Sequence, residues 1–363
     1  MRSFLALITI VFCSSCNVKS IFNKTEAPKT EEVKPPAFEP SFTTVAVDTL
    51  LAEKLSIRTL VIDNNKVWYA ANNGNYGNID LKDGKRFVGH IQKDTLKLEF
   101  RSMAQTEDNI FVLAIGNPGL LYRISKGESA VALVYEEKGE KVFYDAINFW
   151  NENEGIAIGD PTEDCFSLLI TRDGGQTWKK IPCEALPKLA EGEAFFAASN
   201  TNINIKGERT WIVSGGKKSR VFYSEDKGKT WQVTETPILQ GSSMTGIFSA
   251  DFYDETIGFA TGGDYEKPQQ NFGNKIITSD GGKTWSLVGE NNGYGYGSCV
   301  QFVPGSNGNE LVTVGASGVF YSYDKGKTWN KIADYKDLFT LRFIDSKMFI
   351  AAGNKKILRF RLQ

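Results

Sequence analysis

One short motif, S/T-x-D-x-G-x-T-W, occurs four times in this chain and constrains its fold more than any other feature. The copies span residues 171–178, 224–231, 278–285 and 322–329, and their aspartates lie 53, 54 and 44 residues apart. A motif that recurs at intervals of about 40 to 55 residues is typical of repeat architectures, in which each repeat forms one structural unit. The chain is therefore expected to be a repeat protein.

A second recurring feature is a β-rich run that ends in small residues and glycine. Seven such runs occur, and another hydrophobic stretch lies about ten residues before each of them. Short apolar runs bounded by Gly, Asn and Asp are typical of β-strands. Seven repeats of about 46 residues with four strands each predict an all-β, seven-bladed β-propeller with four-stranded antiparallel blades. The seven runs are 67–74, 110–117, 155–161, 210–217, 257–264, 311–318 and 348–355.

The last repeat has too little sequence for its fourth strand. Residues 357–362 supply the third strand, and the segment FTTVAV at 42–47 is an unassigned strand at the other end. Pairing the two segments in one blade would remove exposed sheet edges, which is a physical reason to expect it. We predict that residues 42–363 form one propeller domain whose ring is closed by an N-terminal strand.

The recurring motif falls on the turn between the third and fourth strands of a repeat. Its aspartate can accept hydrogen bonds from backbone N–H groups about two residues further on, and its glycine permits positive φ. Its tryptophan begins the fourth strand and can bury its ring against the sheet. A calcium site needs about six to eight oxygen ligands, so one carboxylate per turn is too few. We assign structural roles to Asp173, Trp178, Asp226, Trp231, Asp280, Trp285, Asp324 and Trp329.

These turns resemble the Asp boxes of sialidases, sortilin-type receptors and the photosystem II stability/assembly factor family. The chain resembles the assembly factor family most through NFWNENEGIAIGDP (148–161), LLITRDGGQTW (168–178) and GEAFFAASNTNI (192–203). The resemblance spans about residues 42–363. It implies a propeller whose Asp boxes lie on the face away from the ligand site. It also implies a relationship to assembly chaperones for a membrane complex in plastids and cyanobacteria.

The first residues are typical of a targeting segment. Arg2 is followed by an apolar run, 4–12, that is too short to span a bilayer. Small residues precede Cys16 and resemble a bacterial lipobox, with an ordinary secretory signal as the alternative. Residues 16–41, rich in Lys, Glu and Pro, indicate a disordered tether. We expect a signal peptide at 1–15 and lipid on Cys16. The protein would then be an exported cell-envelope lipoprotein of the outer membrane or periplasmic face, attached to the membrane through its lipid only.

Charge and histidine content argue against several classes of function. The 42 basic and 43 acidic residues give a net charge of −1, so no basic field predicts a nucleic-acid partner. The one histidine, His90, argues against histidine zinc sites and Ser-His-Asp catalysis, because each needs an imidazole. The glycines of GYGYG (293–297) lack the strand-then-helix context of a dinucleotide site. We expect no cofactor, no bound metal and a monomer.

Candidate binding residues lie on the face opposite the Asp boxes. Two loops between second and third strands, 159–167 and 262–274, are long and charged, which favours a functional role. At the start of the first strand, three repeats place Arg58, Arg101 and Asp145 in matching positions. Paired arginines suit carboxylate, phosphate or acidic-peptide recognition, and ion pairs between blades, such as Arg101 with Asp145, are the alternative. The candidates are Arg58, Arg101, Asp145, Lys217, Lys218, Arg220, Asp264, Tyr265, Tyr294 and Tyr296.

The leading hypothesis is a non-catalytic binding or assembly module for a protein partner at the membrane surface. The alternative is a sialidase-like glycoside hydrolase that acts on or binds glycans. Such an enzyme needs three arginines on the substrate carboxylate, a tyrosine–glutamate nucleophile pair and an aspartic acid/base. SIRT (56–59) only loosely resembles the sialidase arginine motif, and Arg342 lies deeper in its repeat than Arg58. The sequence therefore favours binding over catalysis.

Cys165 and Cys183 flank the first Asp box almost symmetrically. If residue 171 faces residue 177, then Cys165 faces Cys183. Antiparallel neighbours are within disulfide reach, and an exported protein meets an oxidising compartment. We predict a cross-strand disulfide, with two reduced strand cysteines as the alternative. Cys299 is expected to be free and buried in the first strand of the sixth repeat.

Overall fold

The structure, a computed structural model, describes residues 38–363. The predicted signal peptide (1–15), the predicted lipidation of Cys16 and the predicted tether (16–41) up to residue 37 lie outside the described residues. Phe42 is buried against Tyr321, with ring centroids 4.1 Å apart. The chain is therefore packed against the propeller from the residue at which the domain was expected to begin.

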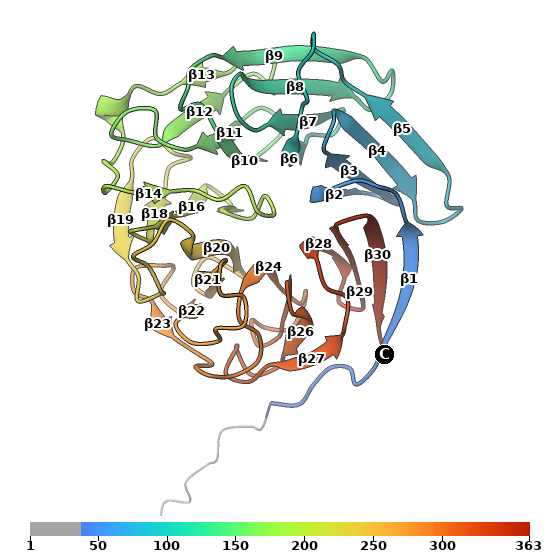
Figure 1. Cartoon of the computed structure of the whole chain (residues 1–363), viewed down its shortest axis with the longest axis vertical. Coiled ribbons are helices and arrows are strands. Elements are labelled where there is room, and N and C mark those ends of the chain that lie inside the picture. The colour runs from blue at the N-terminus through green and yellow to red at the C-terminus, as the bar shows by residue number, and fades with distance from the viewer. Residues whose placement is uncertain (1–37) are drawn as a thin grey trace, which may run out of the picture. The chain divides into compact units, whose positions relative to one another are not determined.

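Seven antiparallel sheets stand around a central axis and form a seven-bladed β-propeller, which confirms the predicted fold class (Figure 1). Within residues 38–363 the structure has no α-helix, and no helix is long and hydrophobic enough to cross a bilayer. The first blade consists of β2 (Ile57–Asp63), β3 (Lys66–Ala71), β4 (Asn75–Asp80) and β5 (Arg86–His90). The second consists of β6 (Phe100–Gln105), β7 (Asn109–Ala114), β8 (Gly119–Ser125) and β9 (Val131–Glu137). The third consists of β10 (Tyr144–Phe149), β11 (Gly155–Gly159), β12 (Ser167–Thr171) and β13 (Lys179–Lys180). The fourth blade consists of β15 (Ile203–Lys206), β16 (Arg209–Val213), β18 (Arg220–Ser224) and β19 (Gln232–Glu235). The fifth includes β20 (Thr245–Phe252), β21 (Gly258–Asp264), β22 (Lys275–Thr278) and β23 (Ser286–Leu287). The sixth consists of β24 (Gly297–Phe302), β25 (Leu311–Gly315), β26 (Gly318–Ser322) and β27 (Asn330–Ala333).

The seventh blade combines strands from both ends of the described chain. It holds β28 (Leu338–Asp345), β29 (Met348–Gly353), β30 (Lys356–Leu362) and, outermost, β1 (Val45–Leu51). β1 pairs antiparallel with β30, with Val45 opposite Leu362 and Thr49 opposite Leu358. The strand thus lies slightly later in the sequence than the expected 42–47.

The core lies between neighbouring blades. The second strands of the blades, which are the runs that end in small residues, are deeply buried, and every residue of β11 and β25 is buried. Both faces of such a strand are covered by adjacent sheets, so its sequence is a continuous apolar run. Aromatic side chains join the blades: Trp211 of β16 stacks on Phe252 of β20 with ring centroids 3.8 Å apart. Apolar burial between sheets is the main stabilising contribution.

Each Asp box is a corner held by its own hydrogen bonds. The Oδ1 of Asp280 accepts the backbone N–H of Thr284 at 2.9 Å, and its Oδ2 accepts the Thr284 hydroxyl at 2.6 Å. The N–H donor lies four residues on and not two as expected, because the turn is longer than a simple Asx turn. Gly281 and Gly282 hold φ at 77° and 86° within it, which favours glycine. The same pair of bonds recurs at Asp173, Asp226 and Asp324.

The Asp280 carboxylate is expected to make stability depend on pH. Burial alone would raise its pKa, but hydrogen bonds from Thr284 and Thr278 outweigh burial and lower the pKa to about 2. Because the unfolded chain has the ordinary value of 3.8, the carboxylate stabilises the fold above about pH 4, and this contribution is lost as pH falls towards 2. Asp280→Asn should be less stable than wild type at neutral pH and should lose less stability on acidification. Urea unfolding across this pH range measures both effects, and parallel curves for the two proteins would contradict the assignment.

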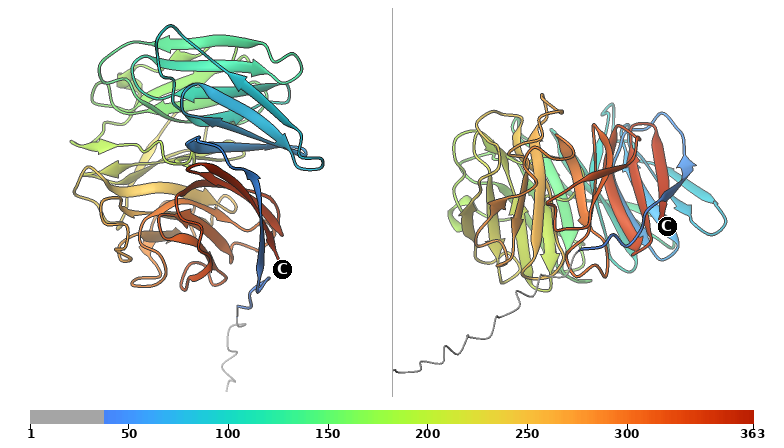
Figure 2. Two further views of the ribbon diagram at one scale, coloured as in Figure 1. Left: turned by 45° about the vertical axis from the view of Figure 1, so that its right-hand side comes forward. Right: turned by 90° about the horizontal axis from the view of Figure 1, so that it is seen from below.

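The two faces of the ring differ in the turns that they carry. The box turns hydrogen-bond to the turns between first and second strands: the Gly174 N–H donates to Asn153 O, and the Gly281 N–H to Thr256 O. Both kinds of turn therefore share one side, the box face. The loops between second and third strands and the connections between blades lie on the opposite side, the loop face. Figure 2 shows the strands crossing the ring between these faces.

Cys165 and Cys183 form a disulfide with their Cα atoms 5.6 Å apart. The expected cross-strand geometry is wrong. β12 pairs with β13 so that Leu169 lies opposite Lys180, one position away from the predicted register, and β13 ends at Lys180. Cys183 begins a 3-10 turn, η1 (Cys183–Ala185), so the bridge joins two loop segments instead of two facing strand residues. Cys299 is free and buried in β24, as expected.

Candidate functional site

Six of the seven innermost strands carry a β-bulge at the same point, close to their start. In β2 the pairing register shifts between Ile57 and Thr59, so Arg58 is an extra residue without a partner in the ladder. Bulges re-aim a side chain and are frequent beside functional sites. Arg101 and Asp145 are the extra residues of β6 and β10, so the three positions that the sequence matched are equivalent in the structure. The equivalents in β20, β24 and β28 are Phe248, Ser298 and Phe339.

The loop face holds a pocket of about 440 Å³ at its end of the central channel, the loop-face pocket. Arg58 and Arg101 both line it, and Asp160 supplies a carboxyl group. Two planar cations beside aromatic rings suit a ligand that carries an acidic group on a partly apolar body. The aromatic lining is Phe143, Phe195, Phe196, Phe248, Tyr265 and Tyr296.

Arg58 is a cation without an acidic partner. Its guanidinium lies over the ring of Phe339, 4.0 Å from the centroid, and donates to the carbonyl oxygen of Ala198 at 3.5 Å. Across residues 38–363, no carboxylate lies within ion-pairing distance of it. Burial, and then the positive charge of Arg101, lower the pKa of Arg58, but an arginine keeps its proton. Arg58 therefore presents to the pocket a positive charge that no carboxylate pairs with, although the Asp160 carboxyl group also lines the pocket.

Arg101 and Asp145 do not form the ion pair that was the alternative to binding. Arg101 pairs with Glu99 instead, with Nη2 2.7 Å and Nε 2.8 Å from the same carboxylate oxygen. Asp145 is fully buried, and the only donors close to its carboxyl group in the described part of the chain are the backbone N–H groups of Ala197 and Asp160, too poorly placed for regular hydrogen bonds. Burial, and then the negative charge of Asp160, raise the pKa of Asp145 and favour its neutral form. Asp145 is thus buried close to the pocket but does not line the pocket.

Asp160 is the pocket carboxyl that the sequence did not single out. Its Oδ1 accepts the Phe195 N–H at 2.8 Å, and burial raises its pKa to about 6. It lies in the charged loop 159–167, so its loop was identified from the sequence but the residue was not. Within residues 38–363, no three Asp, Glu, His or Cys side chains are grouped as a metal site.

The tyrosines predicted near the channel divide between two environments. Tyr265 and Tyr296 line the pocket with their rings edge to face, centroids 5.1 Å apart. Tyr294 is buried between blades with its hydroxyl 3.0 Å from the Thr261 hydroxyl, and it does not line the pocket. Asp264 is buried at the end of β21 and also lies outside the pocket lining.

The basic residues predicted in the fourth blade do not line the loop-face pocket. Arg220 forms a buried ion pair with Glu193, with Nη2 2.5 Å from Oε2, and the Glu193 side chain has no exposed surface. Lys217 and Lys218 pair with surface glutamates. Sequence reasoning missed the ion pair because Glu193 precedes Arg220 by 27 residues and meets it only in the folded chain.

Residues 195–202, the channel loop, cross the central channel. They follow β14 (Glu193–Ala194), which pairs with β17 (Gly215–Gly216) on the sheet of the fifth blade, and they reach towards the centre of the ring in Figure 1. The loop is hydrogen-bonded to the innermost strands of all six other blades. Its partners there are Arg58, Met103, Ile147, Ser249, Ser298 and Thr340.

The channel loop separates two pockets. Ala197 and Ala198 line the loop-face pocket, whereas Asn200 lines a second pocket at the other end of the channel. The loop belongs to the segment GEAFFAASNTNI, which the sequence marked only as a family resemblance. The detectable signal was the run of small and polar residues, 197–202, where a hydrophobic innermost strand was expected.

Arg342 does not supply the third arginine that a sialidase-type site would need. The seventh-blade equivalent of Arg58 is Phe339, and Arg342 lies three residues beyond it. Arg342 lines the second pocket and not the loop-face pocket. The loop-face pocket thus has two arginines in its lining.

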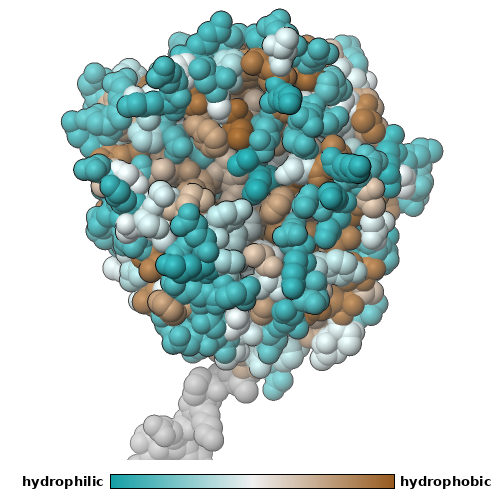
Figure 3. Space-filling view, in the orientation of Figure 1, coloured by the Kyte–Doolittle hydropathy of each residue, from teal (hydrophilic) through white to brown (hydrophobic). Residues whose placement is uncertain are grey.

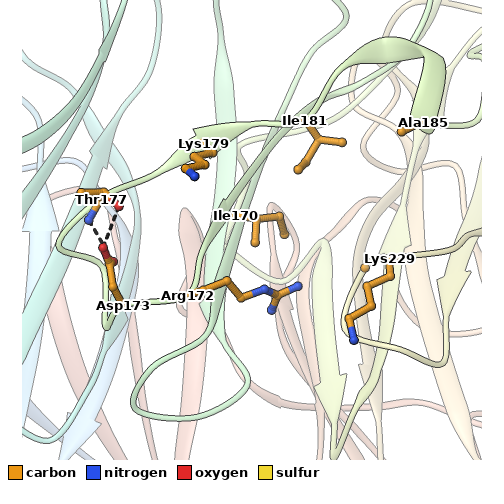
Figure 4. A pocket seen from close by; sticks show the side chains of 9 residues that line it. Ile170, Arg172, Asp173, Thr177, Lys179, Ile181, Ala185 and Lys229 are labelled. Carbon is orange, nitrogen blue, oxygen red and sulfur yellow. Dashed lines mark hydrogen bonds between the residues drawn. The ribbon is translucent and has the colours of Figure 1, made fainter.

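A larger cavity, of about 570 Å³, lies beside the Asp box of the third blade (Figure 4). Its carboxylate and its guanidinium already have partners: Asp173 accepts from Thr177, and Arg172 pairs with Glu154 at 2.9 Å. The acidic group therefore serves the turn, and the cavity lacks the free arginine of the loop-face pocket. We take the loop-face pocket as the candidate site.

Known proteins share this architecture. Residues 169–180 and 276–287 match the BNR/Asp-box repeat family. YCF48 from Cyanidioschyzon merolae is 13% identical, with a TM-score of 0.63 over 87% of this chain and 99% of that one. A structure described as YCF48 bound to D1 peptide is 13% identical, with a TM-score of 0.61 over 89% and 98% of the two chains. The WD40 repeats of RRP9 are 12% identical, with a TM-score of 0.61 over 89% and 100%. No curated protein sequence matches the chain. At these identities the structural likeness shows the fold alone, and the chain is a seven-bladed β-propeller that carries BNR/Asp-box repeats.

Proposed function

We propose that this chain is a non-catalytic binding module that holds an acidic segment of a partner protein in the loop-face pocket. The observation that carries the proposal is Arg58, which faces this pocket beside Arg101 without a carboxylate partner. Guanidinium groups bind carboxylates through paired hydrogen bonds, and the aromatic walls can take apolar parts of the same segment. The neighbour described as YCF48 bound to D1 peptide supports a polypeptide ligand for a propeller of this kind.

The wider proposal is an assembly factor of the cell envelope. Its support is the lipobox-like sequence before Cys16 and the Lys-, Glu- and Pro-rich stretch that follows. A lipid anchor and a flexible tether would concentrate the loop face near membrane-protein partners without fixing its orientation. Hydrophilic residues cover most of the face seen in Figure 3, and hydrophobic ones form small separate patches.

The glycan-processing alternative has less support in the pocket. A sialidase-like site needs a third arginine and a tyrosine–glutamate pair. Among the described residues, neither Arg342 nor any glutamate contributes to the lining of the loop-face pocket. The two tyrosines and Asp160 are compatible with a polar ligand, and the arginines favour an acidic one.

Replacing both pocket arginines should strongly weaken recognition of acidic segments. Arg58→Gln combined with Arg101→Gln is expected to weaken binding by about 100-fold, because each lost charge-assisted hydrogen bond contributes about 1.5–3 kcal/mol. Fluorescence anisotropy with labelled peptides that combine acidic and aromatic residues measures the effect. Peptides with lysine in place of each acidic residue should not bind wild type.

Lys217→Gln combined with Lys218→Gln is the matched control. It removes the same charge from the loop face but from residues outside the pocket, so peptide affinity should change by about twofold at most. Equal weakening by the two double variants would show that net charge is responsible and would overturn the pocket proposal. A pull-down from membranes adds a second test, since recovery of the same proteins by wild type and the arginine variant would also contradict it.

A further inference from the structure

The second pocket, of about 300 Å³, lies at the opposite end of the central channel, on the box face. Residues near the ends of β2, β6, β10, β24 and β28 line it, where these strands approach their turns, together with Asn200 of the channel loop. Because the channel loop crosses between the two pockets, this box-face pocket is separate from the proposed partner site. Its polar lining is Gln105, Asn148, Asn200, Gln301 and Arg342.

Two of the four amide side chains in the box-face pocket keep a free donor. Asn200 and Gln105 use both their oxygen and their nitrogen in hydrogen bonds. The Oδ1 of Asn148 accepts the N–H of the next residue at 2.8 Å, and the Oε1 of Gln301 accepts the Phe343 N–H at 3.1 Å. These backbone donors define which end of each amide is oxygen. Among residues 38–363, the Nδ2 of Asn148 and the Nε2 of Gln301 then have no hydrogen-bond partner.

Arg342 gives the box-face pocket a positive charge. Its guanidinium donates to neutral acceptors, the carbonyl oxygens of Leu341 at 2.6 Å and Ser199 at 3.1 Å. No carboxylate in the described chain lies within ion-pairing distance of it, and the buried Asp251 interacts with it only at longer range. An arginine does not lose its proton at physiological pH, so the charge persists.

We propose that the box-face pocket binds a small oxyanion, such as phosphate or a short carboxylate. Its free polar side-chain groups are N–H donors and its charge is positive, whereas an oxyanion presents mainly acceptors. A sugar would need acceptors as well as donors, because each hydroxyl donates a proton. The apolar residues Val61 and Phe343 form part of the wall, beside the donors that would hold the anion.

Asn148→Asp and Gln301→Glu test the proposal on two different blades. Each keeps the oxygen that accepts a backbone N–H and replaces the free donor by a negatively charged acceptor of the same shape. Calorimetric titration of the full chain with inorganic phosphate and, separately, with citrate should show binding at least about tenfold weaker than wild type in each variant. The unfolding midpoint without anion should be unchanged. Arg342 itself is a poorer choice, because its guanidinium holds the channel loop through Ser199.

Lys217→Gln is the matched control, because it removes a positive charge from a residue that lines neither pocket and should leave anion affinity unchanged. The side-chain NH₂ resonances of Asn148 and Gln301 in the wild-type protein should also shift on addition of phosphate, whatever the stability of the variants. The proposal is overturned if wild type binds neither anion at millimolar concentrations, if those resonances do not move, or if Asn148→Asp and Gln301→Glu bind as tightly as wild type.

Discussion

Replacement of Asn200 by alanine should destabilise the propeller by about 3–5 kcal/mol, although Asn200 lies in a loop. Its Nδ2 donates to Met103 O at 2.7 Å, and its Oδ1 accepts the Ile147 N–H at 3.0 Å, so one side chain links the second and third blades. Alanine would leave the buried Ile147 N–H unpaired, which costs about 1–3 kcal/mol, and would also lose the bond to Met103. Asn200 has φ of 58°, a conformation that costs alanine about another 1–2 kcal/mol. Urea unfolding of the full chain measures the loss.

Asn200→Gly separates the two causes. Glycine loses the same hydrogen bonds but adopts positive φ without a steric penalty, so it should be less destabilising than alanine by about 1 kcal/mol. Equal stability of wild type and Asn200→Ala would show that the channel loop does not tie the blades together. If glycine proves worse than alanine, the backbone conformation at this position is not a source of strain.

Glu193→Ala should be comparably destabilising, by about 3–5 kcal/mol, because it leaves Arg220 without its buried partner. The Glu193 carboxylate accepts from Nε and Nη2 of Arg220 at 3.1 and 2.5 Å, from the Ser214 hydroxyl at 2.6 Å and from the Ala190 N–H at 2.9 Å. All of these donors would lose their acceptor together. The measurement is again the midpoint of urea unfolding, at pH 7.

Glu193→Gln is the control for packing. It keeps the size of the side chain and one oxygen but removes the charge, so its loss should be smaller than that of alanine. Because Ala194 and Phe195 follow directly and line the loop-face pocket, Glu193→Ala should also weaken peptide binding. A change in stability below about 1 kcal/mol for Glu193→Ala would mean that water replaces the carboxylate and that the ion pair is not structural.

Site residues were predicted correctly where a local sequence pattern identified them, and incorrectly where their partners lie far away in the sequence. Arg58 and Arg101 were found because equivalent strands repeat the same local pattern, and both line the loop-face pocket. Arg220 was placed with them because its charge and its loop position were visible, but its partner Glu193 was not. Tyr294 lies only two residues before Tyr296, which lines the pocket. The ring of Tyr294, however, is buried between blades and does not reach the pocket.

The disulfide shows the same limit. Symmetry about the Asp box brought Cys165 and Cys183 to attention, but the chain leaves the sheet after Lys180. A register derived from symmetry holds only while both strands continue, and the length of β13 is set by packing and by the 3-10 turn that follows. The bridge therefore joins the predicted residues through a different backbone geometry.

The sequence by itself determined the repeat, the strand order within a blade, the number of blades and the structural turns. These features follow from local patterns: alternating burial in strands, glycine at positive φ, and an aspartate that accepts hydrogen bonds from its own turn. Tertiary structure alone decided which charges face a pocket, where the channel loop lies, and that two separate pockets occupy the ends of one channel. The physical reason is that each of these features depends on contacts between blades, and residues as distant as Ser199 and Thr340 meet only when the ring is assembled.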